Sequence, residues 1–165
     1  MQSRRIKVKK TKTDYLMEVV SILSLVLAFG VIAYQWSELP HSLGIHYNAA
    51  GQADTFGPKW MLFLMPITGL ITWIGMTYLN RFPHKFNYTI KVTESNAQRL
   101  YKIGIRTITT LKMLVSLLLS IMTITFATAA INKSTSINLI AILTFVTLIV
   151  ITPIYSVIKM NRVGK

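Results

Sequence analysis

The sequence predicts an all-α integral membrane protein with four transmembrane helices. It contains four apolar runs of about 20 residues, and a helix of that length spans the roughly 30 Å hydrocarbon core of a bilayer. Of the 165 residues, 52% are hydrophobic and 14% are charged. Because the hydrocarbon core holds no water, each run must satisfy its own backbone hydrogen bonds, as a helix does. A soluble bundle is the alternative, but a chain this short cannot cover four such runs.

The four runs occupy residues 16–36, 60–79, 107–130 and 137–158. They leave an external loop at 37–59 and a cytoplasmic segment at 80–106. The first run could instead be a cleaved signal peptide, because basic residues precede it. It is too long for the apolar part of such a peptide, and Tyr34 and Trp36 stand where small residues normally precede the cleavage site.

Basic residues set the expected orientation. The chain carries 18 Lys and Arg against 5 Asp and Glu, a formal net charge of +13. Six of the basic residues lie in the tail 1–14, six in 80–106 and three after the fourth run, all on one side of the predicted membrane. Cytoplasmic loops are enriched in Lys and Arg, so we expect both chain ends in the cytoplasm. This distribution explains the high positive charge without a nucleic-acid partner. The basic residues would instead be attracted to anionic membrane lipids, which are the expected partners.

Glu18 and Lys112 are the only ionisable residues inside the four runs. Both lie near the expected cytoplasmic ends, and we expect Lys112 to extend its ammonium toward that end. Ion-coupled carriers usually place charge near the membrane midplane. The sequence therefore argues against an ion-coupled transporter that acts on its own.

The external loop 37–59 contains most of the chemically reactive polar residues that lie outside the two tails. It is rich in turn-forming residues and long for a helix–helix connection, and loops of this kind often carry function. In an extended segment, Ile45 and Tyr47 would face the helix bundle or the lipid, and His46 and Asn48 would face the polar side.

His46 and Asp54 admit two interpretations. In the first, imidazole and carboxylate bind zinc or a similar divalent metal, with His41 or Glu38 as a further ligand. In the second, they hydrogen-bond backbone groups and hold the loop in shape. We favour the second, because the spacing matches no strong metal motif. No catalytic constellation is visible, so we expect no enzyme activity and no cofactor beyond that possible metal.

The cytoplasmic segment 80–106 predicts a helix that leads into the third run. Ser95 and Gln98 have the spacing of a capping box. The helix would lie at the lipid headgroups with its basic residues on phosphates, or dock a cytoplasmic partner. Its candidate contact residues are Asn96, Arg99, Tyr101, Lys102 and Arg106.

The loop sequence ELPHSLGIHYNAAGQADTFGPKW resembles the signature of a bacterial membrane family, the domain of unknown function 1648. The same domain forms the N-terminal part of the sporulation-delaying-toxin immunity protein of Bacillus-type bacteria. The loop matches are Leu39, Pro40, His46, Tyr47, Asn48, Gly51, Asp54, Gly57 and Lys59. The cytoplasmic matches are Asn87, Tyr88, Thr93, Asn96, Tyr101 and Arg106. The loop departs from the pattern at His41 and Gly44, where an acidic residue and a proline are common.

The resemblance implies a family domain at 15–130, with the fourth helix and a tail at 131–165. It implies a multi-pass protein of the bacterial cytoplasmic membrane, of immunity or signalling type and not an enzyme. Its external loop would recognise an exported peptide, such as a toxin, or an envelope component, and its cytoplasmic side could meet a regulator. The chain is shorter than the immunity protein, so we expect it to lack that protein's extra C-terminal membrane domain.

The loop residues expected to bind a ligand or to hold the loop in shape are His46, Asn48, Gly51, Asp54 and Lys59. Two other functions stay open. One is a metal-dependent envelope hydrolase or transferase that uses His46 and Asp54 as ligands. The other is an accessory subunit of a membrane transporter.

Overall fold

A computed structural model describes residue 6 and residues 8–163. Its elements, in chain order, are α1 (Lys12–Tyr34), β1 (Ser42–Tyr47), β2 (Ala53–Pro58), the 3-10 turn η1 (Lys59–Phe63), α2 (Leu64–Leu79), the 3-10 turn η2 (Pro83–Lys85), α3 (Ala97–Ile131) and α4 (Ile140–Val163). In the described part of the chain, four helical segments are long and apolar enough to cross a membrane. The predicted four-helix membrane fold is confirmed, with one small sheet added to it.

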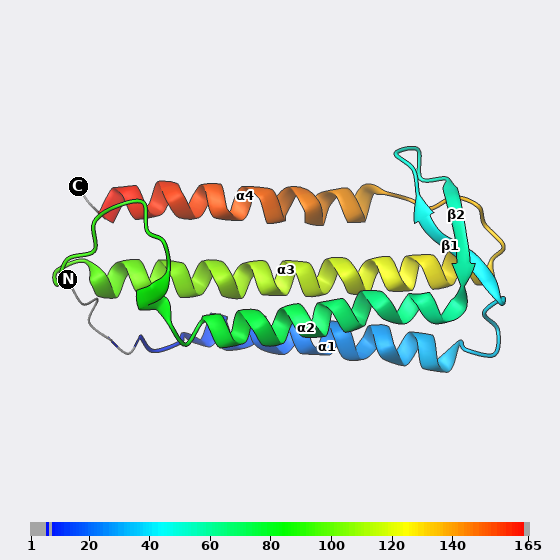
Figure 1. Cartoon of the computed structure of the whole chain (residues 1–165), viewed down its shortest axis with the longest axis horizontal. Helices are drawn as coiled ribbons and strands as arrows, with labels where there is room; N and C mark the ends of the chain where they lie inside the picture. The colour runs from blue at the N-terminus through cyan, green and yellow to red at the C-terminus, as the bar shows by residue number, and fades with distance from the viewer. Residues whose placement is uncertain (1–5, 7, 164–165) are drawn as a thin grey trace.

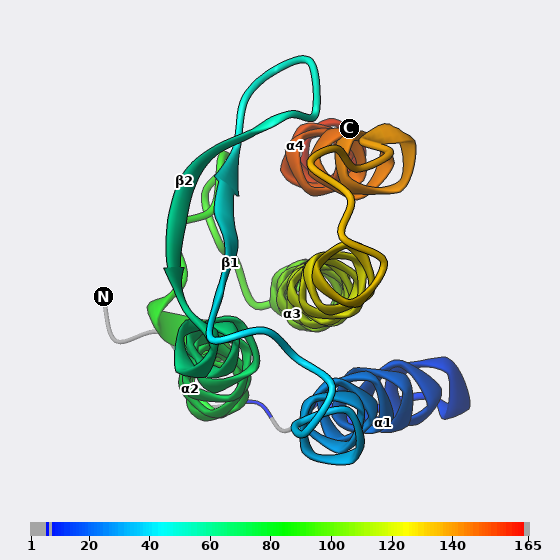
Figure 2. The ribbon, with the colours of Figure 1, turned by 90° about the vertical axis from the view of Figure 1, so that its right-hand side faces the viewer.

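The central helix of the bundle is α3, which has α1 and α2 on one side and α4 on the other (Figures 1 and 2). Both described chain ends lie at one end of the bundle, here named the terminal end, and the strands lie at the opposite, hairpin end (Figure 1). The outward faces of the helices carry many large apolar side chains. Such faces are stable against lipid tails, whereas in water they would drive aggregation.

The first helix begins earlier than the sequence predicted, at Lys12 instead of about residue 16. A capping box explains the difference. The Thr11 hydroxyl accepts a hydrogen bond from the Asp14 amide at 3.3 Å, and the Asp14 carboxylate accepts one from the Thr11 amide at 2.7 Å. Each side chain thus satisfies a donor that the helix leaves free.

The predicted helix before the third span is confirmed, and it continues into that span as a single helix, α3. Its 35 residues correspond to about 52 Å, well beyond a hydrocarbon core of about 30 Å. The predicted capping box at Ser95 is wrong, since Asn96 precedes the helix and the Ser95 hydroxyl lies 3.0 Å from the Thr93 hydroxyl. This segment is collinear with the span (Figure 1), and the position of its basic residues at the lipid headgroups stays a prediction.

The first turns of α3 bury their apolar face against the chain itself. Leu100 and Tyr101 are 0% and 1% exposed, and Tyr88 from the preceding segment packs on the Tyr101 ring with centroids 5.7 Å apart. Gly104 provides the space, because a Cβ there would lie 2.8 Å from the Phe86 ring. The segment between α2 and α3 is therefore held against α3 instead of leaving this face to lipid.

At the hairpin end, the external loop folds into an antiparallel pair of strands that the sequence did not predict. Leu43 lies opposite Gly57 and Tyr47 lies opposite Ala53. Of the two directions expected for Ile45 and Tyr47, the structure shows the one toward the helix bundle, because both pack on the apolar cluster at this end. The Tyr47 ring lies 4.5 Å from the Phe126 ring of α3, so the hairpin rests directly on the central helix.

The close approach at Gly104 gives a test of the packing. Gly104→Ala adds a Cβ against Phe86 and Tyr88, and we expect it to lower the free energy of unfolding by about 1–3 kcal/mol, because a filled core resists extra atoms. Gly75→Ala, where nothing lies within 4 Å of the added Cβ, should be neutral or slightly stabilising. Unfolding by SDS titration in mixed micelles measures both, and equal stabilities would contradict the packing.

Candidate functional site

Two polar sites stand out, one on the hairpin and one inside the bundle. On the hairpin, His46 of β1 and Asp54 of β2 face each other across the strands, with Nδ1 and Oδ1 2.6 Å apart. Their side chains are 67% and 41% exposed. The predicted backbone hydrogen bonds are thus replaced by a direct contact between the two side chains. It links the strands and leaves the imidazole Nε2 free of this contact.

The turn of the hairpin is built by two of the predicted loop residues. The Asn48 side-chain oxygen accepts hydrogen bonds from the Ala50 amide at 2.9 Å and from the Gln52 amide at 3.1 Å. Gly51 adopts φ +75°, in the left-handed region that suits glycine. Asn48 and Gly51 therefore shape the turn of the hairpin.

The hairpin is also tied to the connection between α3 and α4. The Ala53 amide donates to the Thr135 carbonyl and the Ile137 amide donates to the Gly51 carbonyl, both at 2.8 Å. Gln52 and Ser136 form an isolated bridge between the same segments. The hairpin tip is thus held to the connection that leads from α3 into α4.

Lys59 fixes the base of the hairpin. Its ammonium donates to the Trp36 carbonyl at 2.8 Å and to the Leu39 carbonyl at 3.4 Å, and it lies 4.5 Å from the centre of the Trp36 ring. The positive charge meets two carbonyl oxygens and the negative face of an indole ring. We infer that Lys59 stabilises the exit from α1 and does not reach the His46–Asp54 pair.

The surroundings of the hairpin shift two acid–base equilibria. The hydrogen bond from His46 is the main cause that lowers the pKa of Asp54 below its ordinary value of 3.8. Desolvation raises the pKa of Tyr47, because that ring is partly buried against the bundle. The Asp54 carboxylate is therefore ionised throughout the neutral range and available as a hydrogen-bond acceptor.

The geometry of the hairpin brings two of the predicted metal ligands together. Among the described residues, however, no group of three or more His, Cys, Asp or Glu side chains is placed to hold a metal ion. Glu38 and His41, the further ligands considered, do not complete such a group with the pair. Protein zinc sites normally supply at least three ligands, so His46 and Asp54 would need ligands from elsewhere.

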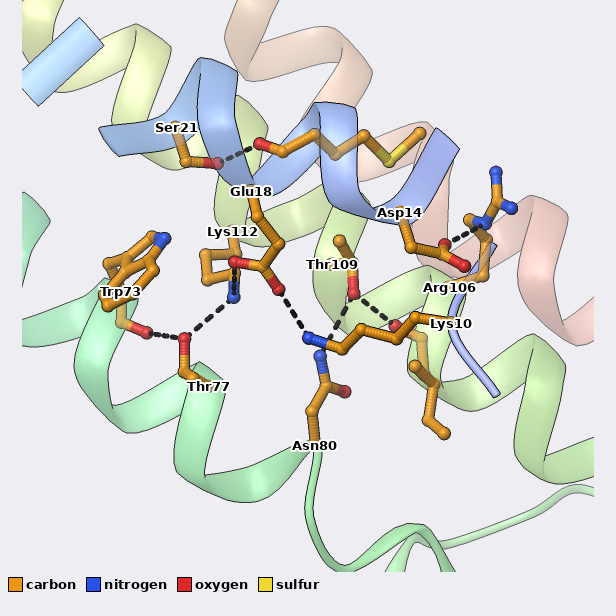
Figure 3. Close-up of polar contacts among 12 residues, drawn as sticks. Lys10, Asp14, Glu18, Ser21, Trp73, Thr77, Asn80, Arg106, Thr109 and Lys112 are labelled. Carbon is orange, nitrogen blue, oxygen red and sulfur yellow. Dashed lines mark hydrogen bonds and ion pairs between the residues drawn. The ribbon is translucent and has the colours of Figure 1, made fainter. Parts of the chain in front are cut away.

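The second site lies inside the bundle, where three helices meet at one buried ammonium group (Figure 3). Lys112 of α3 is 0% exposed. Its Nζ atom contacts the Glu18 carboxylate of α1 at 2.5 Å and donates to the Thr77 hydroxyl of α2 at 2.8 Å. It also lies 4.9 Å from the centre of the Trp73 ring. The predicted extension of Lys112 toward the membrane surface is wrong, since a partner carboxylate lies closer.

Further polar contacts continue from this ion pair toward the terminal end. Lys10 donates to the second oxygen of Glu18 at 3.0 Å, and the Asn80 amide donates to the Thr109 hydroxyl at 3.1 Å. Arg106 contacts Asp14 with Nε 2.5 Å from the carboxylate. These contacts run from the ion pair to the start of α1 (Figure 3). We name Lys10, Glu18, Thr77 and Lys112 the buried ion network.

Sequence reasoning identified Glu18 and Lys112 but did not pair them. Their opposite charges were the available signal, because ionisable residues within a membrane usually pair with one another. What the sequence did not supply was which helices are neighbours. The two side chains are 94 positions apart in the sequence, and they meet only when α1 packs along α3.

The predicted cytoplasmic contact residues separate into two groups. Tyr101 is buried, and Asn96 accepts a hydrogen bond from the Thr93 amide at 2.8 Å, so both are structural. Arg99 and Lys102 are exposed on α3. Arg106 lines the same surface of α3 as Arg99 and Lys102, but its guanidinium group is paired with Asp14.

Removing Lys112 tests the buried ion network. We expect Lys112→Met to lower the free energy of unfolding by about 3 kcal/mol, because it leaves the Glu18 carboxylate with Lys10 alone in a poorly solvated site. The double variant Glu18→Gln/Lys112→Met should recover most of the loss. Lys85→Met, at an exposed position, is the control. SDS titration measures all three together with the single variant Glu18→Gln, and strictly additive effects of the two single substitutions would rule out the pairing.

The hairpin contact predicts a pH dependence. Because the folded pKa of Asp54 is lowered, the stabilisation by the contact is fully present above pH 3.8 and is lost as the pH falls through the lowered value. We expect the carbon NMR shift of the Asp54 carboxyl to titrate below pH 3.8. His46→Ala should move the titration back toward 3.8, whereas His41→Ala should not. An unchanged titration in His46→Ala would show that the contact is absent in solution.

Comparison with known proteins adds one match. The curated proteins and the solved structures give no match to this chain. A family model described as a domain of unknown function (DUF1648) matches residues 23–70. That segment runs from within α1 to within α2 and contains the whole hairpin. The resemblance of this segment to the domain of unknown function 1648, predicted from the loop sequence, is thereby confirmed.

Proposed function

We propose that this chain is a non-enzymatic protein of the bacterial cytoplasmic membrane whose hairpin binds an exported peptide or an envelope component. The observation that carries the proposal is a hairpin that is fixed at its base, its face and its tip while β2 stays open to solvent. Four of the six β2 residues are exposed, and β1 faces the helices. The distribution of basic residues supports an external position for this end.

An open strand edge is a natural binding surface for an extended peptide. Backbone amides and carbonyls at such an edge pair with an added strand, and neighbouring side chains give specificity. Among the described residues, no backbone hydrogen bond joins residues 54–58 to an element beyond β1 and the adjoining turn. His46 and Asp54 would then offer a charged or polar contact, and Phe56 would offer an apolar contact.

The fixed hairpin favours binding over catalysis. Its polar residues are largely engaged in holding the loop, with Asn48 in the turn and Lys59 at the base. A metal-dependent hydrolase would need a third ligand and a bound water near His46 and Asp54. An accessory role beside a transporter would use the lipid-facing helices instead of the hairpin. An immunity role toward a peptide toxin is the form of binding that the family resemblance favours.

Photo-crosslinking from the strand tests the proposal. A benzophenone amino acid at Phe56, which is 58% exposed, should capture one defined partner in living cells of the source organism. The same amino acid at Tyr34, at the end of α1, is the control position and should not capture it. The measurement is the mass of the crosslinked product and the identity of its fragments.

Variants of the polar pair make the test specific. His46→Ala/Asp54→Ala should lower capture from Phe56 several-fold at equal membrane levels. Glu38→Gln/His41→Ala, which changes exposed loop residues outside the strand contact, should leave capture unchanged. Equal capture by both double variants, or equal capture from Tyr34, would reject the hairpin as the binding surface.

A further inference from the structure

A groove runs between α3 and α4 at the terminal end of the bundle. Its volume is about 840 Å³, and residues from α1, α3 and α4 line it. The Thr107 and Ser156 hydroxyls meet across its floor at 2.6 Å, so the two helices touch there. The groove is therefore a feature of the packed bundle. The start of α3 and the end of α4, which supply most of its lining residues, lie at the end of the bundle opposite the hairpin (Figure 1).

The walls of the groove are apolar and open. Ile103 of α3 lines it together with Ile151 and Tyr155 of α4, which are 50% and 62% exposed. Leu148 continues the wall toward the middle of the membrane and is 42% exposed. Apolar side chains at this depth are stable only against another apolar group.

The rim of the groove is positively charged. Basic residues from both helices surround its mouth: Arg99, Lys102, Arg106, Lys159 and Arg162. Arg106 is neutralised by Asp14, but within the described chain no ion pair joins the other four to an acidic side chain. None of the lining residues is acidic. The mouth thus carries four cations with no counter-charge from the described protein.

The dimensions agree with one leaflet of a bilayer. From Arg99 to Thr110, α3 rises by about 16 Å, close to half of a hydrocarbon core of about 30 Å. The charged residues lie toward the helix ends and the apolar residues lie deeper. A charged rim above an apolar channel matches a phospholipid, whose phosphate would lie at the rim and whose acyl chain would lie in the groove.

We propose that this groove binds one anionic phospholipid from the leaflet at the terminal end. The phosphate lies among Arg99, Lys102, Lys159 and Arg162, and an acyl chain lies along Ile103 and Ile151. A second copy of the chain would bring like charges together at the rim. A soluble acidic peptide would satisfy the rim but leave the deeper apolar walls uncovered. The binding is independent of the function proposed for the hairpin.

Native mass spectrometry of the whole chain in detergent tests the proposal, with phosphatidylglycerol and phosphatidylcholine as probes. We expect one phosphatidylglycerol to be retained at detergent concentrations that remove phosphatidylcholine. Lys102→Gln/Lys159→Gln/Arg162→Gln should weaken phosphatidylglycerol binding at least about tenfold, since each basic residue contributes to attraction of anionic lipid. Lys9→Gln/Lys85→Gln/Lys91→Gln removes the same charge from exposed positions outside the groove and should have little effect.

A second variant separates the groove from general attraction of charge. Thr152→Trp places an indole ring in the groove and keeps every cation, so it should also displace the lipid. If the two triple charge variants lost phosphatidylglycerol binding equally, the attraction between lipid and protein would be unspecific, and the proposal would be overturned. Full retention of phosphatidylglycerol by Thr152→Trp, or a dimer without bound lipid, would overturn it as well.

Discussion

Exclusion of water from the helix bundle is the constraint on which the rest of this structure depends. A charged side chain in that environment must find its counter-charge inside the protein. Lys112 finds Glu18, and the Thr77 hydroxyl and the Trp73 ring complete its surroundings. One ammonium group thereby fixes how α1, α2 and α3 lie against one another near the terminal end.

The fourth helix is attached differently. It packs on α3, where the Thr107 and Ser156 hydroxyls are in contact, and it takes no part in the buried ion network. The groove stays open between these two helices. The connection before α4 is nevertheless tied to the hairpin through Thr135 and Ile137. The central helix α3 thus contacts the hairpin at one end, the ion network deeper in the bundle and the groove at the other end.

Much of this fold could be predicted because hydrocarbon imposes a simple pattern on sequence. The four apolar runs predicted the four helices. The alternation of apolar and polar residues at 45–48 predicted that Ile45 and Tyr47 share one face, which packs on the bundle. The hairpin was missed although the turn chemistry of Asn48 and Gly51 was visible, since strand pairing also needs the partner segment at 53–58. The capping box at Thr11 and Asp14 was missed because Asp stands where Glu or Gln is usual.

Contacts between distant segments could not be predicted from one sequence. The Glu18–Lys112 pair and the groove both depend on which helices are neighbours, and hydropathy does not encode that order. The His46–Asp54 contact was only half predicted. The two residues were selected for their chemistry, but their meeting across two strands follows from the register of the hairpin.

Cysteine labelling tests the central claim, that the hairpin and the terminal end lie on opposite sides of a membrane. The chain contains no cysteine, so single cysteines at Ala49 and at Gln98 report each end without background. In intact cells, a membrane-impermeant maleimide should label Ala49→Cys and should label Gln98→Cys only after lysis. Labelling of both positions in intact cells, or of Gln98→Cys alone, would contradict the account.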